Sequence, residues 1–216
     1  MQFGHVTRPT HVNTSWDVAR FETVAHRWVH VGEPGFGVAV ANDSSYGHDI
    51  TRKRSHDDAG EGGTVGSTVR ITLLRAPLFP DPDADQGEHT FRAAVTFGAD
   101  VAEAVRQGYA INLPERRVAG GCEVAPLVRV ADPQVVVESV KLAEDGSGDV
   151  VVRLYESLGA RATTTIALDF AHGDVTVTDL LERPLAGATT PSVGQDGAVV
   201  LVLRPFEIVT LRVARG

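Results

Sequence analysis

The sequence predicts an all-β fold with two β-sandwich regions, the second of them immunoglobulin-like, and at most one short helix. The 216 residues include 22 glycines and 11 prolines, which fall between short β-branched runs rather than inside long helical patterns. From residue 134 onward, short runs of this kind follow one another closely, and glycine-containing turns separate several of them. Repeated short strands with such turns are typical of antiparallel sandwiches.

The pattern changes near the middle of the chain. Between residues 114 and 133, charged residues, two glycines and a short Leu-Val run replace the clear strand signals. We therefore expect a first β-sandwich region over residues 1–118, a linker over 119–132 and a small immunoglobulin-like sandwich over 133–216. A chain of this length can bury a core in each of two small domains.

In the first region, β-branched and alternating segments predict strands over residues 21–31, 38–41, 68–74 and 88–97. Residues 42–66 are rich in Gly, Asp, Ser, Arg and His, so we expect a long polar loop there. One helix is predicted over residues 101–106. Asp100 is a suitable N-cap for it, and Gly108 is expected to end it.

In the second region, strands are predicted over residues 135–140, 150–155, 163–170, 175–181, 198–203 and 208–213. The last two are expected to form a hairpin with residues 204–206 at its turn. Their alternation then directs four side chains into the core, namely Leu201, Leu203, Val209 and Leu211.

Charge and composition argue against several classes of protein. Twenty Lys and Arg against 28 Asp and Glu give a net charge of −8, which disfavours binding to the phosphates of a nucleic acid. No apolar run approaches the roughly 20 residues that span a bilayer. The first residues lack the layout of a signal peptide. We therefore expect a soluble, cytoplasmic protein that binds neither nucleic acid nor membrane.

Metal-binding patterns are weak. Cys122 is the only cysteine, which excludes a thiolate cluster within the chain. His26 and His30 lie on one predicted strand, about 13 Å apart at 3.3 Å per residue, too far to share an ion. The acidic stretch 81–88 departs from a calcium-binding loop, because Gln86 and Arg92 stand where such a loop needs Gly and Glu. No cofactor is expected in this chain.

Signals for catalysis are equally sparse. The sequence has no G-x-S-x-G elbow and no phosphate-binding glycine motif. Carboxylate pairs could serve glycoside chemistry, but 28 acidic residues supply such pairs everywhere. Aromatic residues concentrate in the first 80 positions, and sugar rings stack on aromatic faces. Tyr46, within a polar segment, is the best surface candidate among them.

Ten segments, in this order along the chain, together resemble the C-terminal β region of family 38 glycoside hydrolases, the α-mannosidases. They are RPTH (8–11), NTSWD (13–17), ARFE (19–22), AHRW (25–28), EPGFGVA (33–39), NDSSYGHD (42–49), LRAP (74–77), PDP (80–82), DQGEH (85–89) and LRPFEI (203–208). The set spans almost the whole chain.

The resemblance implies an enzyme much larger than this chain. Family members carry an N-terminal catalytic domain with a zinc site and an aspartate nucleophile, and nothing in the sequence matches those motifs. We expect a C-terminal piece whose Met1 is an artificial or internal start and which is inactive alone. Its partners would be the missing catalytic domain, a mannoside-containing glycan and a second copy of the chain.

By their positions in the motifs, Asp43, Tyr46 and Arg75 are the substrate-side candidates, at the rim of the mannoside pocket. Arg75 ends a predicted strand just before Ala76 and Pro77, where the missing proline N–H stops a ladder. Its guanidinium could donate to sugar hydroxyls. The alternative is an ordinary surface ion pair, contributing about 0–1 kcal/mol.

Two other functions stay open at this point. The chain could be a free-standing carbohydrate-binding module, which predicts an aromatic platform and sugar affinity in isolation. It could also be a purely structural or oligomerisation domain. A non-catalytic part of a zinc-dependent retaining α-mannosidase predicts instead an exposed apolar patch where the catalytic domain would pack.

Overall fold

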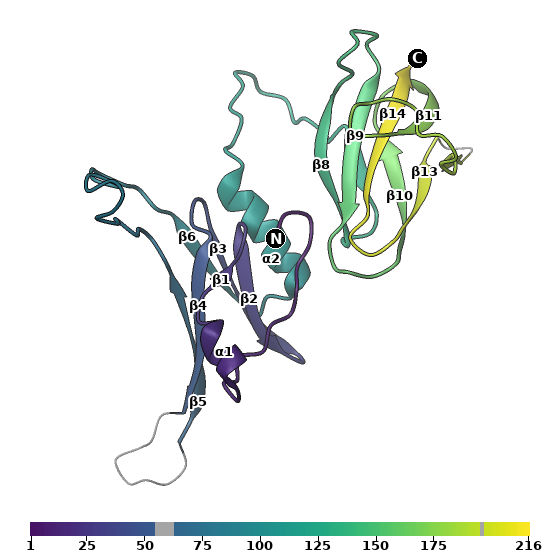
Figure 1. Cartoon of the computed structure of the whole chain (residues 1–216). Helices are drawn as coiled ribbons and strands as arrows, with labels where there is room; N and C mark the ends of the chain where they lie inside the picture. The colour runs from purple at the N-terminus through teal and green to yellow at the C-terminus, as the bar shows by residue number, and fades with distance from the viewer. Residues whose placement is uncertain (55–62, 195–196) are drawn as a thin grey trace. The chain divides into compact units, whose positions relative to one another are not determined.

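The computed structural model describes residues 1–54, 63–194 and 197–216 (Figure 1). The chain forms two compact units. The first unit contains Met1 and Val6–Arg116, and the second contains Gln2–His5 and Arg117–Gly216.

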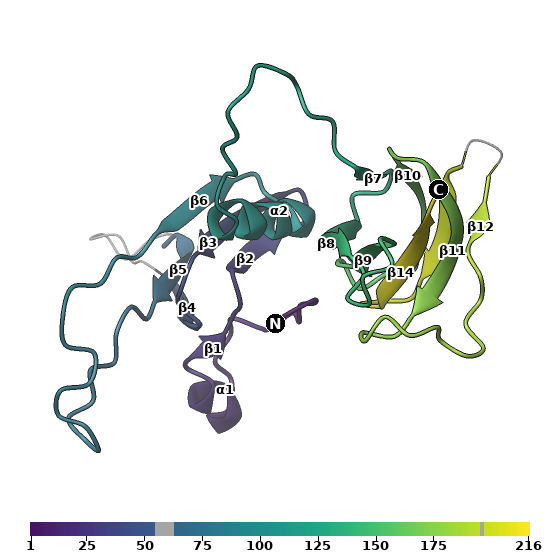
Figure 2. The ribbon, with the colours of Figure 1, turned by 90° about the horizontal axis from the view of Figure 1, so that it is seen from above.

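The first unit contains two three-stranded antiparallel sheets, ordered β1-β4-β5 and β2-β3-β6. Helix α2 packs on β2, β3 and β6, and Figure 2 shows it lying against this second sheet. The elements are α1 (Ser15–Ala19), β1 (Thr23–Val24), β2 (Trp28–Glu33), β3 (Phe36–Asn42), β4 (Gly47–Arg54), β5 (Val65–Ile71), β6 (Ala93–Phe97) and α2 (Val101–Asn112).

Two strand expectations in the first unit need correction. The predicted strand over residues 21–31 is divided into β1 and β2, because the intervening Arg27 has a φ of +67°, which a strand cannot accommodate. The expected polar loop over residues 42–66 instead contains β4 and part of β5, which pair along their length. Arg52 and Lys53 of β4 are exposed, so these charged side chains are compatible with the pairing. Residues 55–62 of that expected loop lie outside the described residues.

The helices also differ from expectation. Helix α2 continues past Gly108 to Asn112, so Gly108 does not end it. A Cβ at Gly108 would come within 2.8 Å of Cδ1 of Trp28, which shows that this glycine permits close packing of α2 on β2. A second, short helix, α1, is fixed at its start by Thr14 and Asp17, which cap each other's backbone N–H groups.

The second unit is a sandwich of two four-stranded antiparallel sheets, ordered β12-β13-β10-β7 and β11-β14-β9-β8. Its core contains the fully buried Leu154, Ile166, Leu203 and Leu211. Its strands are β7 (Val128–Val130), β8 (Val135–Leu142), β9 (Val150–Glu156), β10 (Ala162–Leu168), β11 (His172–Thr178), β12 (Ser192–Val193), β13 (Val199–Leu203) and β14 (Ile208–Arg215).

The predicted hairpin of the last two strands is wrong, although the side chains expected to point into the core do so. β13 pairs with β10 and β12, whereas β14 pairs with β9 and β11 in the other sheet. Residues 204–206 therefore connect the two sheets of the sandwich. Leu201, Leu203 and Leu211 are buried as expected, and Val209 is partly buried against them.

The all-β class is confirmed, and the described residues form two helices in place of the single short one expected. Neither of these helices is both long and apolar enough to cross a membrane, as far as the structure describes the chain.

Candidate functional site

The candidate site lies in the first unit, where residues 43–46 connect β3 to β4. Asn42, the last residue of β3, is buried, and its Oδ1 accepts hydrogen bonds from the backbone N–H groups of Ser44 (3.1 Å) and Ser45 (2.7 Å). An asparagine at the end of an apolar strand often forms this kind of turn. The turn fixes the backbone that carries Asp43 and Tyr46.

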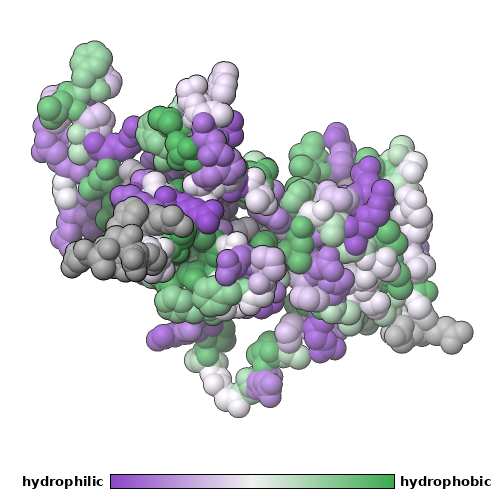
Figure 3. All heavy atoms as spheres, turned by 90° about the horizontal axis from the view of Figure 1, so that it is seen from below, coloured by the Kyte–Doolittle hydropathy of each residue, from purple (hydrophilic) through white to green (hydrophobic). Residues whose placement is uncertain are grey.

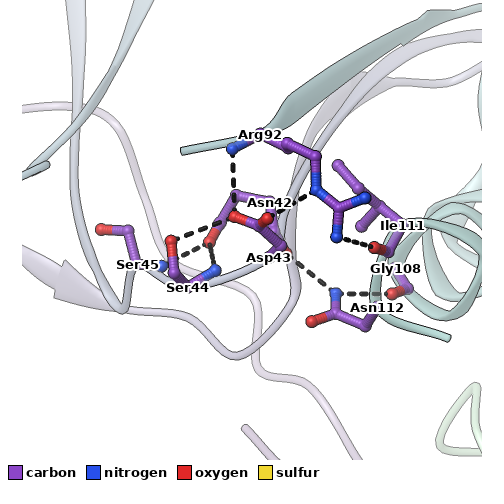
Figure 4. A network of polar contacts seen from close by, with 8 residues as sticks. All are labelled: Asn42, Asp43, Ser44, Ser45, Arg92, Gly108, Ile111 and Asn112. Carbon is purple, nitrogen blue, oxygen red and sulfur yellow. Dashed lines mark hydrogen bonds and ion pairs between the residues drawn. The ribbon is translucent and has the colours of Figure 1, made fainter. Parts of the chain in front are cut away.

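Asp43 is held by Arg92, which precedes β6 (Figure 4). Its carboxylate accepts hydrogen bonds from Nε of Arg92 (2.8 Å), from the backbone N–H of Arg92 (3.1 Å) and from Oγ of Ser44 (3.1 Å). The side-chain bond to Arg92, followed by the backbone bond, lowers the pKa of Asp43 to about 2. The carboxylate is therefore ionised at neutral pH.

The end of helix α2 closes the same network. Nδ2 of Asn112 donates to the carbonyl oxygens of Asn42 (2.9 Å) and Gly108 (2.8 Å). Nη2 of Arg92 donates to the carbonyl oxygen of Ile111 (3.4 Å). Figure 4 shows the end of β3, Arg92 and the last turn of α2 converging on this point. The loop position is thus set by three elements far apart in the sequence.

His48 supports the loop from within the unit. It is fully buried, its Nδ1 lies 3.1 Å from the carbonyl oxygen of Tyr46, and its Nε2 lies 3.3 Å from Nδ2 of Asn42. A carbonyl only accepts, so Nδ1 must carry the proton, and Nε2 then accepts from the Asn42 amide. This arrangement needs a neutral imidazole, and burial lowers the pKa of His48.

We expect the first unit to lose stability as the pH falls below about 6.5, because the unfolded chain then binds a proton that folded His48 resists. The loss should begin near the unfolded pKa and level off below the lowered folded pKa. Urea unfolding followed by tryptophan fluorescence, from about pH 7.5 to 5.5, measures it, since both tryptophans lie in the first unit.

His48→Gln should flatten that pH dependence, because glutamine does not titrate. His89→Gln, at an exposed position of the same unit, is the matched control and should leave the slope unchanged. An equal slope in all three proteins would contradict the role given to His48.

Tyr46 is about half exposed (48%), and its hydroxyl lies 2.9 Å from Nδ1 of His26. Arg75 follows β5 and is exposed. Oγ of Ser45 donates to the carbonyl oxygen of Thr72, which ties the loop to the chain segment leading to Arg75. The structure thus places Asp43 and Tyr46 on one loop. Within the described part of the chain, no hydrogen bond or ion pair joins the side chains of Asp43, Tyr46 and Arg75.

Sequence reasoning missed the residues that hold this loop, namely Asn42, His48, Arg92 and Asn112. Only Asn42 had a local signal, an Asn-Asp-Ser-Ser stretch after an apolar strand. The pairing of Asp43 with Arg92 joins residues 49 positions apart, which no local pattern reveals.

The described residues include no group of three or more His, Cys, Asp or Glu side chains that could hold a metal ion. His26 lies next to Tyr46, and Nε2 of His30 lies 2.8 Å from the carbonyl oxygen of Ala99. A zinc ion of the kind that the resemblance implies therefore does not fit the donor set described here.

Two family descriptions match the chain. "Glycosyl hydrolases family 38 C-terminal domain" matches residues 1–83, and "Glycosyl hydrolases family 38 C-terminal beta sandwich domain" matches residues 134–211. The first match lies almost wholly in the first unit, and the second lies within the second unit.

Curated relatives match along most of the chain. Alpha-mannosidase 2C1 of Homo sapiens is 36% identical over 98% of this chain and 20% of its own length. Alpha-mannosidase G of Dictyostelium discoideum is 34% identical over 76% of this chain and 14% of its own length. The alpha-mannosidase of Saccharomyces cerevisiae is 30% identical over 98% of this chain and 20% of its own length. The chain thus spans a fifth or less of these relatives.

Two solved structures share the fold. A glycosyl hydrolase family 38 protein from Enterococcus faecalis has a TM-score of 0.64 at 21% identity, covering 97% of this chain and 24% of that one. An alpha-mannosidase from Enterococcus faecalis V583 has a TM-score of 0.62 at 22% identity, covering 97% and 23%. These likenesses extend over nearly the whole chain.

Proposed function

Because this chain belongs to the C-terminal region of glycosyl hydrolase family 38, we propose that it is a non-catalytic part of an α-mannosidase. In this proposal it supports the catalytic part and contributes to the rim of the mannoside site. The observation that carries the supporting role is the distribution of apolar side chains in the first unit.

The first unit buries small side chains and exposes large ones. Its buried apolar residues are mainly alanines: Ala25, Val29, Ala39, Ala41, Ala99, Ala104 and Val105. Large side chains of residues 6–24 lie in solvent instead, with Trp16 exposed by 73%, Phe21 by 76% and Val24 by 69%. Helix α1, within this segment, buries none of its residues. Figure 3 shows hydrophobic residues at many places on the face that it draws.

Such exposure is typical of a surface that a partner covers, since aromatic side chains dominate the energetics of interfaces. The relatives extend far beyond the length of this chain, which supplies a partner of the right kind. We therefore assign residues 6–24, here named the apolar segment, to contact with the catalytic part.

Trp16→Ser tests this role because its effect should depend on context. In this chain alone the free energy of unfolding should change by less than about 0.5 kcal/mol, as for other exposed positions. In a longer family protein that carries this sequence after a catalytic part, loss of an interface anchor should cost about 2 kcal/mol or more. Heat inactivation of the longer protein would then become several-fold faster.

Val118→Ser is the matched control, since Val118 is 88% exposed outside the apolar segment. It should change neither the free energy of unfolding of this chain nor the rate of heat inactivation of the longer protein. If Trp16→Ser also leaves the rate of heat inactivation of the longer protein unchanged, the supporting role is refuted.

Zinc and the aspartate nucleophile of the proposed enzyme would be held outside this chain. The resemblance places both in the catalytic domain of family members, and the described residues of this chain offer no group of three metal ligands. The contribution of this chain to the reaction would be to bind and orient the substrate at its rim.

Asp43 and Arg75 offer different chemistry to that rim. A carboxylate has about four acceptor positions, and three of those on Asp43 are used by Arg92 and Ser44, which leaves one for a sugar hydroxyl. The Arg75 guanidinium has no hydrogen-bond or ion-pair partner in the described part of the chain, so all its donors remain for a substrate. Tyr46 adds a half-exposed ring face.

Arg75→Ala should reduce kcat/KM of the longer enzyme by the equivalent of about 1–3 kcal/mol, without lowering its thermal stability. Arg52→Ala, at an exposed position on β4, is the control and should leave kcat/KM unchanged. Unaltered kinetics for Arg75→Ala, or a loss matched by unfolding, would remove Arg75 from the rim.

A further inference from the structure

A small hollow lies in the first unit, and all but one of the residues that line it belong to the apolar segment. Its volume is about 80 Å³, and the residues that line it include Arg8, Thr10, His11, Asp17, Arg20, Phe21 and Thr23. About 10–15 Å³ of such volume is enough to hold one water molecule, so the hollow has room for a small polar group.

The hollow is lined by two positively charged side chains that lack a partner among the described residues and by one carboxylate that is already engaged. In the described part of the chain, the guanidinium groups of Arg8 and Arg20 have neither an ion-pair nor a hydrogen-bond partner. The carboxylate of Asp17 is engaged elsewhere: its Oδ2 accepts from the N–H groups of Asn13 and Thr14, both at 3.0 Å. It also accepts from Oγ1 of Thr14 at 3.1 Å. Two cations therefore line one hollow, and its carboxylate already caps helix α1.

We propose that this hollow binds an oxyanion group, a phosphate or a carboxylate, between Arg8 and Arg20. Guanidinium groups bind planar or tetrahedral oxyanions through paired, charge-assisted hydrogen bonds. The hydroxyl groups of Thr10 and Thr23 can add further donors. The net charge of −8 opposes general attraction of anions, so binding would be confined to this place. The proposal concerns this chain by itself, in which Arg8 and Arg20 are exposed. In a longer protein the contact proposed above for the apolar segment would cover the same hollow.

An NMR titration of the isotopically labelled chain tests the proposal. Sodium phosphate, sodium acetate and mannose are added separately at constant ionic strength, and the Nε–Hε signals of the arginines are followed. We expect phosphate or acetate to shift the signals of Arg8 and Arg20 in a saturable manner. Arg20→Gln should weaken binding by about tenfold or more, the effect of losing one charge-assisted contact.

Arg52→Gln is the matched control and should bind as the unaltered chain does. Arg20→Gln should remain folded, because the hydrogen bond from Arg20 to the carbonyl oxygen of Asp17 (3.1 Å), within the described residues, is made by its backbone N–H. Saturation by phosphate alone would identify a phosphoryl ligand, and comparable saturation by acetate would identify a carboxylate. Shifts that never saturate, an equal loss in Arg52→Gln, or saturation by mannose alone would overturn the proposal.

Discussion

Glu156→Ala should lower the free energy of unfolding of the second unit by about 3 kcal/mol or more. Glu156 is the last residue of β9 and is fully buried. Its Oε1 accepts from the backbone N–H of Leu158 (2.8 Å). Its Oε2 accepts from those of Gly159 (2.8 Å), Ala160 (3.2 Å) and Phe206 (2.9 Å).

The size of the effect follows from the number of donors. Alanine would leave four part-buried backbone N–H groups without their acceptor, and a fully buried group left unsatisfied costs about 1–3 kcal/mol. Some of these groups would find water, so the total is expected to fall well short of the sum. The substitution also destabilises residues 204–206, which connect the two sheets, because the backbone N–H of Phe206 donates to the same carboxylate.

Glu156→Gln separates charge from shape. The amide keeps the size of the side chain but replaces one acceptor oxygen by a donor, which then faces N–H groups. We expect Glu156→Gln to lower the free energy of unfolding of the second unit, but by less than Glu156→Ala does. Glu123→Ala, at an exposed position of the same unit, should change stability by less than about 0.5 kcal/mol.

The measurement must report on the second unit. Both tryptophans lie in the first unit, so tryptophan fluorescence is unsuitable. Backbone hydrogen exchange of peptides from β9 and β14 follows the opening of the correct sandwich. Unchanged protection of both strands in Glu156→Ala would contradict the role assigned to this carboxylate.

The second unit shows what the alternation of residues in a strand can predict and what it cannot. Alternation correctly placed Leu203 and Leu211 in the core, because a period of two fixes which face a side chain occupies. It did not reveal that β13 and β14 belong to different sheets. Strand pairing depends on contacts between distant segments, and a short connection can either close a hairpin or cross from one sheet to the other.

The first unit shows a different limit. Gly108 has the usual signal for a helix end, yet α2 continues to Asn112, and the close approach of Trp28, 80 positions earlier, explains why a glycine stands there. The candidate site also depends on contacts between distant segments. Asp43 and Tyr46 could be placed on one loop from the sequence, whereas Arg92 and Asn112, which hold the loop, come from other elements.

Leu211→Ala should lower the free energy of unfolding of the second unit by about 2–5 kcal/mol, the range for a large cavity in a well-packed core. Leu211 lies on β14, between β9 and β11, where it is opposite Val152 on one side and Val177 on the other. It is fully buried in the core cluster. Since strands flank it on both sides, the surroundings have little freedom to collapse into the space.

Leu142→Ala is the matched control for this prediction. Leu142 lies in the same sheet, on the edge strand β8, but is 62% exposed, so its truncation leaves no cavity. We expect a change below about 0.5 kcal/mol there, measured by the same exchange of β9 and β14 amides. A loss below about 1 kcal/mol for Leu211→Ala, or equal losses for the two variants, would mean that β14 does not form the centre of this core.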